Sequence, residues 1–250
     1  MKTVFITGGT SGIGRACAVK MAQKGWNIII TGRRADRLAS FKLEWGDKTK
    51  IYTLCYDVRD RNATQAAVLS LPEEWKNIDV LINNAGNAHG LDLIQEGKYE
   101  DWDAMIDINV KGLLYTTEAV LPLMLSKHSG HIINIGSIAG DEVYTKGAVY
   151  CASKSAVHAI TAGMRLDLNG SGIKVSMVNP GLVETEFSLV RFKGDTHRAT
   201  QVYQGLKALS AEDIADIIAW VVEAPTHVNI AETLVLPLDQ ASATVVNRKS

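Results

Sequence analysis

Tyr150 and Lys154 are the two residues of this chain whose types and spacing most directly suggest proton-transfer chemistry. They lie four positions apart in the segment Val149–Lys154, and residues four apart are neighbours on one face of a helix. A tyrosine keeps its proton until about pH 10, but a nearby positive charge lowers the phenol pKa toward neutrality, which general acid–base catalysis requires. The pair therefore predicts a proton-transfer site. A half-buried tyrosine beside a surface lysine is the plainer alternative, and the spacing alone favours it.

Further polar residues stand where a catalytic site would need them. Ser137 follows the apolar segment 131–135, which places a hydroxyl at the end of a predicted strand. Asn109 falls midway through a predicted long helix, where an amide side chain is a poor helix former, although most such residues simply face solvent. Pro180 and Gly181 follow another predicted strand and direct the chain out over its end.

A glycine-rich segment follows the first apolar run. Thr7 to Arg15 reads TGGTSGIGR, with the spacing Gly-x-x-x-Gly-x-Gly rather than the Gly-x-Gly-x-x-Gly of the common dinucleotide fingerprint. Glycines let the backbone approach a phosphate closely, and a helix N-terminus offers amides and a positive dipole end. Because the segment joins the first strand to the first helix, it predicts a phosphate-binding loop. Its candidate binding residues are Gly8, Thr10, Ser11, Gly12, Ile13 and Gly14.

The end of the second predicted strand, Thr31-Gly32-Arg33-Arg34, distinguishes two cofactors. NAD sites carry an acid there for the ribose hydroxyl, whereas NADP sites carry an arginine for the 2′-phosphate. No acid occupies this turn, and two guanidiniums suit a phosphate, so we predict NADP. The alternative is that the arginines are solvated loop charges, which stays open for Arg34.

Two more strand ends complete the predicted nucleotide site. Asp57, beside Val58, could accept a hydrogen bond from an adenine amino group, or it could be a helix N-cap. Asn84, Ala85 and Gly86 leave room for a ribose, or they form only a turn.

The elements that must position these residues alternate between strands and helices. Apolar runs predict strands at 3–7, 26–31, 50–55, 78–82, 131–135, 173–178 and 233–236, and helices are predicted near 12–24, 34–45, 60–70, 99–127, 148–169 and 210–223. Continuous apolar strands are typical of a parallel sheet covered on both faces, and the alternation predicts an α/β, Rossmann-like, doubly wound fold with seven parallel strands. We expect one domain over residues 1–250. Residues 182–209, without a clear strand, are predicted to form a lid over the active site.

Composition excludes several classes of protein. The net charge of −1 argues against a nucleic-acid partner, and three scattered cysteines indicate a reducing compartment rather than a disulfide framework. No apolar run reaches the roughly 20 residues of a membrane span, so we expect a soluble, cytoplasmic protein without a membrane partner. His128 and His131 lack a third ligand at metal-site spacing, and no metal is predicted.

Together these motifs resemble the short-chain dehydrogenase/reductase superfamily, in order and over essentially the whole chain. Segments such as Gly130–Ser137, Val190–Asp195 and His227–Ile230 are similar more narrowly to bacterial NADP-dependent 3-hydroxy acid dehydrogenases of the serine 3-dehydrogenase type. The resemblance implies that Tyr150 is the general acid–base and that Lys154 lowers its pKa and binds the nicotinamide ribose. It implies that Ser137 holds the substrate oxygen and that Asn109 anchors a water in a proton relay.

The resemblance also implies the cofactor contacts and the assembly. Gly8–Gly14 would contact the pyrophosphate, and Arg33 and Arg34 the 2′-phosphate. Asp57 and Val58 would contact the adenine, and Asn84, with Ala85 and Gly86 beside it, the ribose. The nicotinamide would be contacted by Pro180, Gly181, Val183 and Thr185. Members of the superfamily are dimers or tetramers that pair through the helices near 99–127 and 148–169, and we expect a homotetramer.

The expected reaction is hydride transfer between NADP and a short 3-hydroxy acid such as serine, allo-threonine or 3-hydroxypropionate. Arg191, in the predicted lid, could bind the substrate carboxylate, or it could pair with Asp195 or with a neighbouring subunit. One rival is a reductase of another carbonyl class, acting on a 3-oxoacyl thioester or a xenobiotic ketone. A rival from a different class is an NADP sensor without turnover.

Overall fold

All strands of the protein hydrogen-bond into one parallel sheet. The computed structural model describes residues 1–249, and its sheet has the order β3-β2-β1-β4-β5-β6-β7. The strands are β1 (Thr3–Ile6), β2 (Asn27–Gly32), β3 (Ile51–Cys55), β4 (Val80–Asn83), β5 (Gly130–Ile135), β6 (Ile173–Pro180) and β7 (Glu232–Val235). This confirms the predicted doubly wound fold. That residues 1–250 form a single domain stays a prediction.

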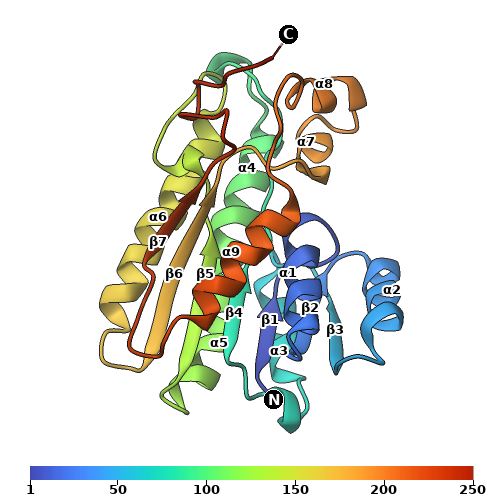
Figure 1. The fold of residues 1–250 in the computed structure, drawn as a ribbon, viewed down its shortest axis with the longest axis vertical. Helices are drawn as coiled ribbons and strands as arrows, with labels where there is room; N and C mark the ends of the chain where they lie inside the picture. Colours follow the sequence, from blue (N-terminus) through green and yellow to red (C-terminus); the bar gives the residue numbers. More distant parts are fainter. Residues whose placement is uncertain (250) are drawn as a thin grey trace.

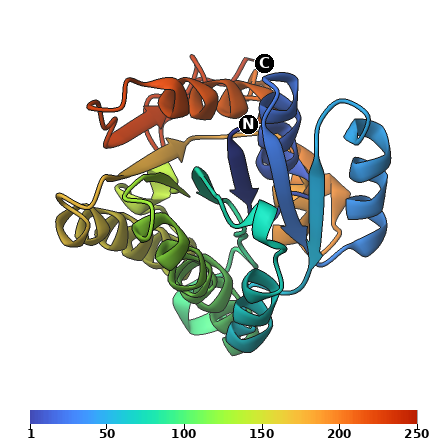
Figure 2. The same cartoon turned by 90° about the horizontal axis from the view of Figure 1, so that it is seen from below.

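Helices cover both faces of the sheet (Figures 1 and 2). The longer ones are α1 (Gly12–Gln23), α2 (Ala35–Trp45), α3 (Arg61–Leu69), α4 (Tyr99–Ile106), α5 (Gly112–Leu125), α6 (Ala148–Asp167) and α9 (Ala211–Glu223). Helices α1, α2 and α9 pack on one face over Val4, Ile6 and Ile30, whereas α3 and α5 pack on the other over Phe5 and Leu81. Adjacent residues of the central strands thus face opposite cores, which is why β1 and β2 consist largely of apolar residues.

The predicted helix near 99–127 is interrupted. Helix α4 ends at Ile106, a π-helical turn η3 follows at Asp107–Lys111, and α5 begins at Gly112. The backbone stays helical across the whole stretch, so the sequence is compatible with one continuous helix although the hydrogen bonding changes. Single π-turns inside α-helices are frequent at functional sites, and this one contains Asn109.

Residues 182–209 contain two short helices rather than an irregular loop. They are α7 (Glu186–Arg191) and α8 (Thr196–Gln201), which begin at the side-chain caps Thr185 and Asp195. Both lie beyond the carboxyl ends of the strands (Figure 1). Whether they act as a lid stays a prediction.

The strand order reverses between β1 and β4. From β1 the chain adds β2 and β3 on one side, and it then returns to add β4 and the later strands on the other side of β1. Ligands of open α/β sheets bind outside the carboxyl ends of the strands at such a point. In the described part of the chain, no helix is long and apolar enough to cross a membrane.

Candidate active site

The glycine loop between β1 and α1 is shaped so that side chains would not fit. Gly8 has φ +66, and a Cβ there would lie 2.9 Å from the Ala85 Cα. A Cβ at Gly14 would lie 2.5 Å from the Gly8 carbonyl oxygen. Thr7 Oγ1 accepts hydrogen bonds from the backbone N–H groups of Asn84 and Ala85, both at 3.0 Å. The loop is therefore held against the end of β4 as a bare backbone surface.

The start of α1 is open to an anion. Ser11 is the N-cap residue, but its side chain makes no capping hydrogen bond, and the first turn of α1 contains no acid. The Ser11 side chain therefore accepts no hydrogen bond from the backbone N–H groups of that turn, and the helix macrodipole favours a negative charge there. A hollow of about 360 Å³ adjoins this turn and is lined by residues 9–12, Arg15, Arg37, Ser40, Phe41, Glu44 and Glu186. These features fit the phosphates of a dinucleotide.

Arg33 and Arg34 have different surroundings. Arg33 is largely exposed, with its Nη1 3.5 Å from Asp57 Oδ2. Arg34 lies on the glycine loop: its Nε and Nη2 donate to Thr10 Oγ1 at 3.1 and 2.9 Å, and its Nη2 donates to Ser11 Oγ at 2.7 Å. Arg34 is therefore not a freely solvated loop charge.

Asp57 lies at the end of β3, where it was predicted, but it does not cap α3. Asp60 is the N-cap, since its side chain accepts from the Ala63 N–H, so the N-cap alternative for Asp57 is wrong. Asp57 instead accepts from Arg59, with Arg59 Nη2 at 2.7 Å. Its partial burial raises its pKa, and the hydrogen bonds and charge of Arg59 outweigh this, so the pKa is lowered. Val58 is buried against Gly112.

Asn84 is tied to the glycine loop. Its side-chain NH₂ donates to the carbonyl oxygens of Thr7 and Gly8 at 2.9 and 3.2 Å. The amide nitrogen thereby holds the backbone of the glycine loop in place. Gly86 is needed for a different reason, because a Cβ there would lie 2.9 Å from Asn109 Oδ1 and 3.6 Å from Lys154 Nζ. The turn after β4 thereby lets these two polar side chains approach each other.

Asn109 is buried, with 2% of its surface exposed, so the solvent-facing alternative is wrong. Its Oδ1 accepts from the Asn87 N–H at 2.9 Å, and its Nδ2 donates to the Asn87 carbonyl at 2.8 Å and to Ser153 Oγ at 3.0 Å. The π-turn carries it to the segment after β4. Helical spacing could not indicate this contact, because it depends on a segment 22 residues away.

Tyr150 and Lys154 lie on α6 as predicted, and both are buried at 8% and 7% exposure. Lys154 Nζ donates to the Ile135 carbonyl at 2.9 Å. Ser137, after β5, accepts from the Ala139 N–H at 3.1 Å and lies close enough to influence the ionisation of Tyr150. The structure thus brings Ser137, Tyr150 and Lys154 to one place at the carboxyl edge of the sheet, with Asn109 beside Lys154 across Gly86.

The electrostatics of the pair differ from the prediction. We expected Lys154 to lower the pKa of Tyr150, but in this structure the pKa of Tyr150 is raised, because burial penalises the phenolate and outweighs the lowering by Ser137 and Arg191. Burial also lowers the pKa of Lys154 to about 8. A protein interior disfavours both charged forms, so spacing alone gave the wrong sign.

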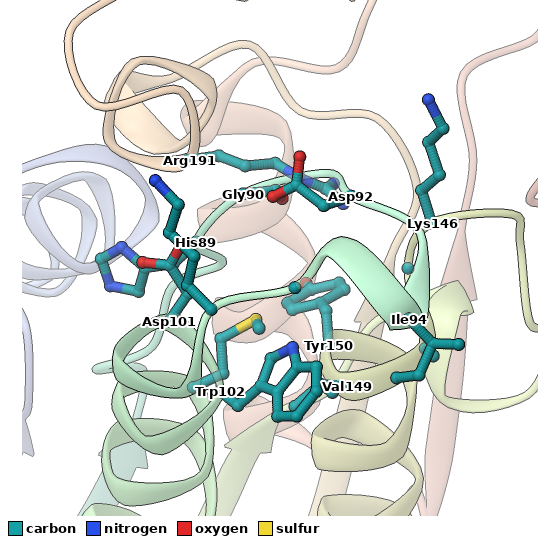
Figure 3. A pocket seen from close by; sticks show the side chains of 15 residues that line it. His89, Gly90, Asp92, Ile94, Asp101, Trp102, Lys146, Val149, Tyr150 and Arg191 are labelled. Atoms are coloured by element: carbon teal, nitrogen blue, oxygen red, sulfur yellow. The ribbon is translucent and has the colours of Figure 1, made fainter.

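A second cavity adjoins Tyr150, and part of its lining is the segment after β4, to which the sequence analysis gave no role. It is bounded by residues 89–102 of the chain after β4, by α6 and by the end of α7, through His89, Gly90, Asp92, Ile94, Gly97, Lys98, Asp101, Trp102, Met105, Lys146–Tyr150 and Arg191. Figure 3 shows the Tyr150 ring within this group, with Arg191 on one side and Trp102 on the other. The long irregular stretch after β4 was a signal that could have indicated it.

Arg191 is fixed over the tyrosines of this cavity. Its Nε donates to the Gly90 carbonyl at 3.0 Å, and its Cζ lies 5.5 Å from the ring centroid of Tyr144 and 5.7 Å from that of Tyr150. Asp195 caps α8 by accepting from the Arg198 N–H. Within residues 1–249, Arg191 forms no ion pair with Asp195 or any other acid.

The segment after β6 crosses toward the glycine loop. Gly181 N–H donates to the Val235 carbonyl at 2.8 Å, and Val183 forms a bridge with Leu209. Thr185 packs against Gly12, since a Cβ on that glycine would lie 3.4 Å from the Thr185 Cβ. Phe187, which sequence reasoning missed, meets Tyr150 edge-on with ring centroids 5.7 Å apart. Helix α7 thus touches both the glycine loop and the tyrosine.

Comparisons with known proteins agree with this architecture. The family model described as short chain dehydrogenase matches residues 2–195. The chain is 46% identical over 241 residues to the NADP-dependent 3-hydroxy acid dehydrogenase YdfG of Escherichia coli K12, covering 96% of each chain. It is 42% identical over 247 residues to sulfoacetaldehyde reductase 2 of Chromohalobacter salexigens, covering 98% of each. The closed form of serine dehydrogenase complexed with NADP⁺ superposes with a TM-score of 0.93 at 44% identity, covering 99% of this chain and 100% of that one.

Proposed function

This chain belongs to the short-chain dehydrogenase family and is an NADP-dependent oxidoreductase acting on CH–OH groups, and on that premise we propose that its substrate is a short 3-hydroxy acid. The substrate class of the dehydrogenases to which it is 44–46% identical supports this choice. Because the chain is an oxidoreductase, we do not retain the hypothesis of an NADP sensor without turnover.

The observation that carries the proposal is the position of Arg191. A guanidinium without a protein carboxylate partner among the described residues lies 5.7 Å from the Tyr150 ring, and guanidinium groups bind carboxylates by paired, charge-assisted hydrogen bonds. A hydroxy acid held at Arg191 by its carboxylate would bring its hydroxyl group toward Tyr150, because both residues line the same cavity.

We assign the chemical roles as follows, with NADP supplying or accepting the hydride. Tyr150 exchanges a proton with the substrate oxygen, and Ser137 holds that oxygen. Because burial raises the pKa of Tyr150, its protonated form dominates at neutral pH and donates the proton during reduction. Lys154 and Asn109, which face each other across Gly86, would form the proton relay behind it.

The nucleotide contacts follow from the fit described above. Gly8–Gly14 and the open first turn of α1 would hold the pyrophosphate, and Arg33 and Arg34 the 2′-phosphate. Asp57 and Val58 would border the adenine, Asn84 the ribose, and Pro180–Val183 together with Thr185 the nicotinamide. We also propose that the protein is a homotetramer. Exposed apolar residues on the two helices expected to pair support this, namely Leu114 and Leu125 on α5 and Leu166 on α6. Light scattering would measure the number of subunits.

A direct test replaces Arg191 by alanine. We expect the Michaelis constant for 3-hydroxypropionate to rise at least tenfold, since a charge-assisted hydrogen bond is worth about 1.5–3 kcal/mol. The Michaelis constant for a neutral alcohol of the same length would change little. Equal effects on both substrates would remove Arg191 from carboxylate recognition.

A second candidate substrate is a short hydroxysulfonate, favoured by the 42% identity to a sulfoacetaldehyde reductase. A sulfonate is also a single anion that a guanidinium binds, so Arg191 does not distinguish it from a carboxylate. The ratio of kcat/KM for 3-hydroxypropionate and 2-hydroxyethanesulfonate decides between them. Another carbonyl class is less well supported, because the cavity beside Tyr150 contains Asp92, Asp101 and Arg191, whose charges suit neither a xenobiotic ketone nor an acyl chain.

A further inference from the structure

Glu186, the first residue of α7, connects the segment over the active site to the cofactor-binding arginines. Its Oε2 lies 2.9 Å from Arg34 Nη1, and its Oε1 lies 2.6 Å from Arg37 Nη1. The three residues come from distant parts of the chain, with 152 and 149 positions separating Glu186 from the two arginines. Neither the motifs nor the catalytic roles assigned above account for this contact.

The two arginines lie together at the glycine loop. Arg34 is fixed there by Thr10 and Ser11, and Arg37 Nη1 also lies 3.5 Å from the Thr10 carbonyl oxygen. Arg37, Thr10 and Glu186 all line the hollow beside the start of α1. Within the described residues, Glu186 is the one carboxylate that pairs with either arginine.

The carboxylate is ionised and reachable by solvent. Partial burial by itself raises the pKa of Glu186, but hydrogen bonds and charges from Arg34 and Arg37 outweigh this and lower it. The Glu186 side chain is 40% exposed. It therefore neutralises part of the positive charge that faces the hollow while remaining able to leave its partners.

A 2′-phosphate needs the same donors. Phosphate monoesters carry between one and two negative charges near neutral pH, and a guanidinium binds them through the same N–H groups that it offers to a carboxylate. Arg34 already donates from Nε and Nη2 to the loop, which leaves Nη1 as its remaining edge, and that edge faces Glu186.

We propose that Glu186 is a specificity-determining residue for the nucleotide: its carboxylate competes with the 2′-phosphate for Arg34 and Arg37 and so limits the preference for NADP over NAD. Removing the carboxylate strengthens binding only of nucleotides that carry the 2′-phosphate. The inference concerns nucleotide binding alone and holds for any hydroxy acid or sulfonate substrate.

The test compares two nucleotides that differ only in this phosphate. Dissociation constants of 2′,5′-ADP and 5′-AMP are measured by calorimetry on the full-length protein without substrate, for the wild type, for Glu186→Gln and for Glu184→Gln. Glu184 is exposed and two positions away, so its variant changes the net charge equally without touching either arginine. Two exposed ion pairs are worth a few tenths to 1 kcal/mol each, so we expect Glu186→Gln to tighten 2′,5′-ADP binding about three- to tenfold and to leave 5′-AMP binding unchanged.

Three results would overturn the proposal. Unchanged or weaker binding of 2′,5′-ADP by Glu186→Gln would mean that the carboxylate supports the site rather than competes for it. Equal tightening of both nucleotides would mean that the carboxylate repels any phosphate near the hollow and does not compete for the donors of the 2′-phosphate. Equal tightening by Glu184→Gln would reduce the effect to net charge. Because no hydroxy acid enters the assay, failure of the proposed substrate class would show separately, as absence of turnover.

Discussion

Replacing Lys154 by methionine should make the protein more stable at neutral pH while removing its activity. Lys154 is 7% exposed, and burial lowers its pKa from 10.5 to about 8. At about 1.4 kcal/mol for each pH unit, this difference means that the charged form costs about 3 kcal/mol in the folded protein. Methionine fills a similar volume without a charge. Loss of the hydrogen bond to the Ile135 carbonyl offsets about 1 kcal/mol, which leaves a net gain of about 2 kcal/mol.

The gain should depend on pH with a defined sign. Below about pH 8, Lys154 is protonated in both the folded and unfolded states, and the folded wild type carries the full cost. Between about pH 8 and 10.5 the unfolded state binds more protons, so wild-type stability rises with pH. At pH 9.5 less than half of the cost remains, and the advantage of the variant falls to less than about 1 kcal/mol.

The measurement is urea unfolding at pH 7 and pH 9.5, at one fixed protein concentration because an oligomer's stability depends on it. Lys50→Met, at an exposed position before β3, is the matched control and should show no such difference between the two pH values. Two results would refute the reasoning that burial of this ammonium destabilises the protein. One is a Lys154→Met variant that is less stable than the wild type at pH 7. The other is a difference in unfolding free energy between variant and wild type that does not change with pH.

Two further substitutions test the remaining parts of the site. Tyr150→Phe should reduce kcat by about 100-fold or more, the usual contribution of a general acid–base, while calorimetry still detects NADP binding; undiminished turnover would contradict the role of the phenol. Gly14→Ala would place a Cβ 2.5 Å from the Gly8 carbonyl oxygen, so we expect NADP affinity to fall at least tenfold, with far-UV circular dichroism unchanged. Wild-type affinity in that variant would mean that the loop relaxes freely and is not a shaped cradle.

The strands and most helices could be predicted from the sequence because their signals are local. Val4 and Phe5 face opposite cores, and burial on both faces requires an uninterrupted apolar run, which any reader of the chain can see. The helix start at Ser210 is equally local, since its capping box with Asp213 is written within four residues. The interruption at residues 107–111 could not be predicted from the sequence, because the backbone remains helical there and only the hydrogen-bond pattern changes.

By itself, then, the sequence determined the parallel doubly wound sheet, the glycine loop after its first strand, and the placement of Tyr150 and Lys154 on one helix face. Only the tertiary structure decided the direction in which the pKa values of that pair are shifted, since this direction depends on how much water the fold removes around Tyr150 and Lys154. It also decided that Asn109 meets the segment after β4 and that Glu186 meets Arg34 and Arg37. Contacts between residues so distant in the chain have no spacing rule, because the packing of all the intervening elements creates them.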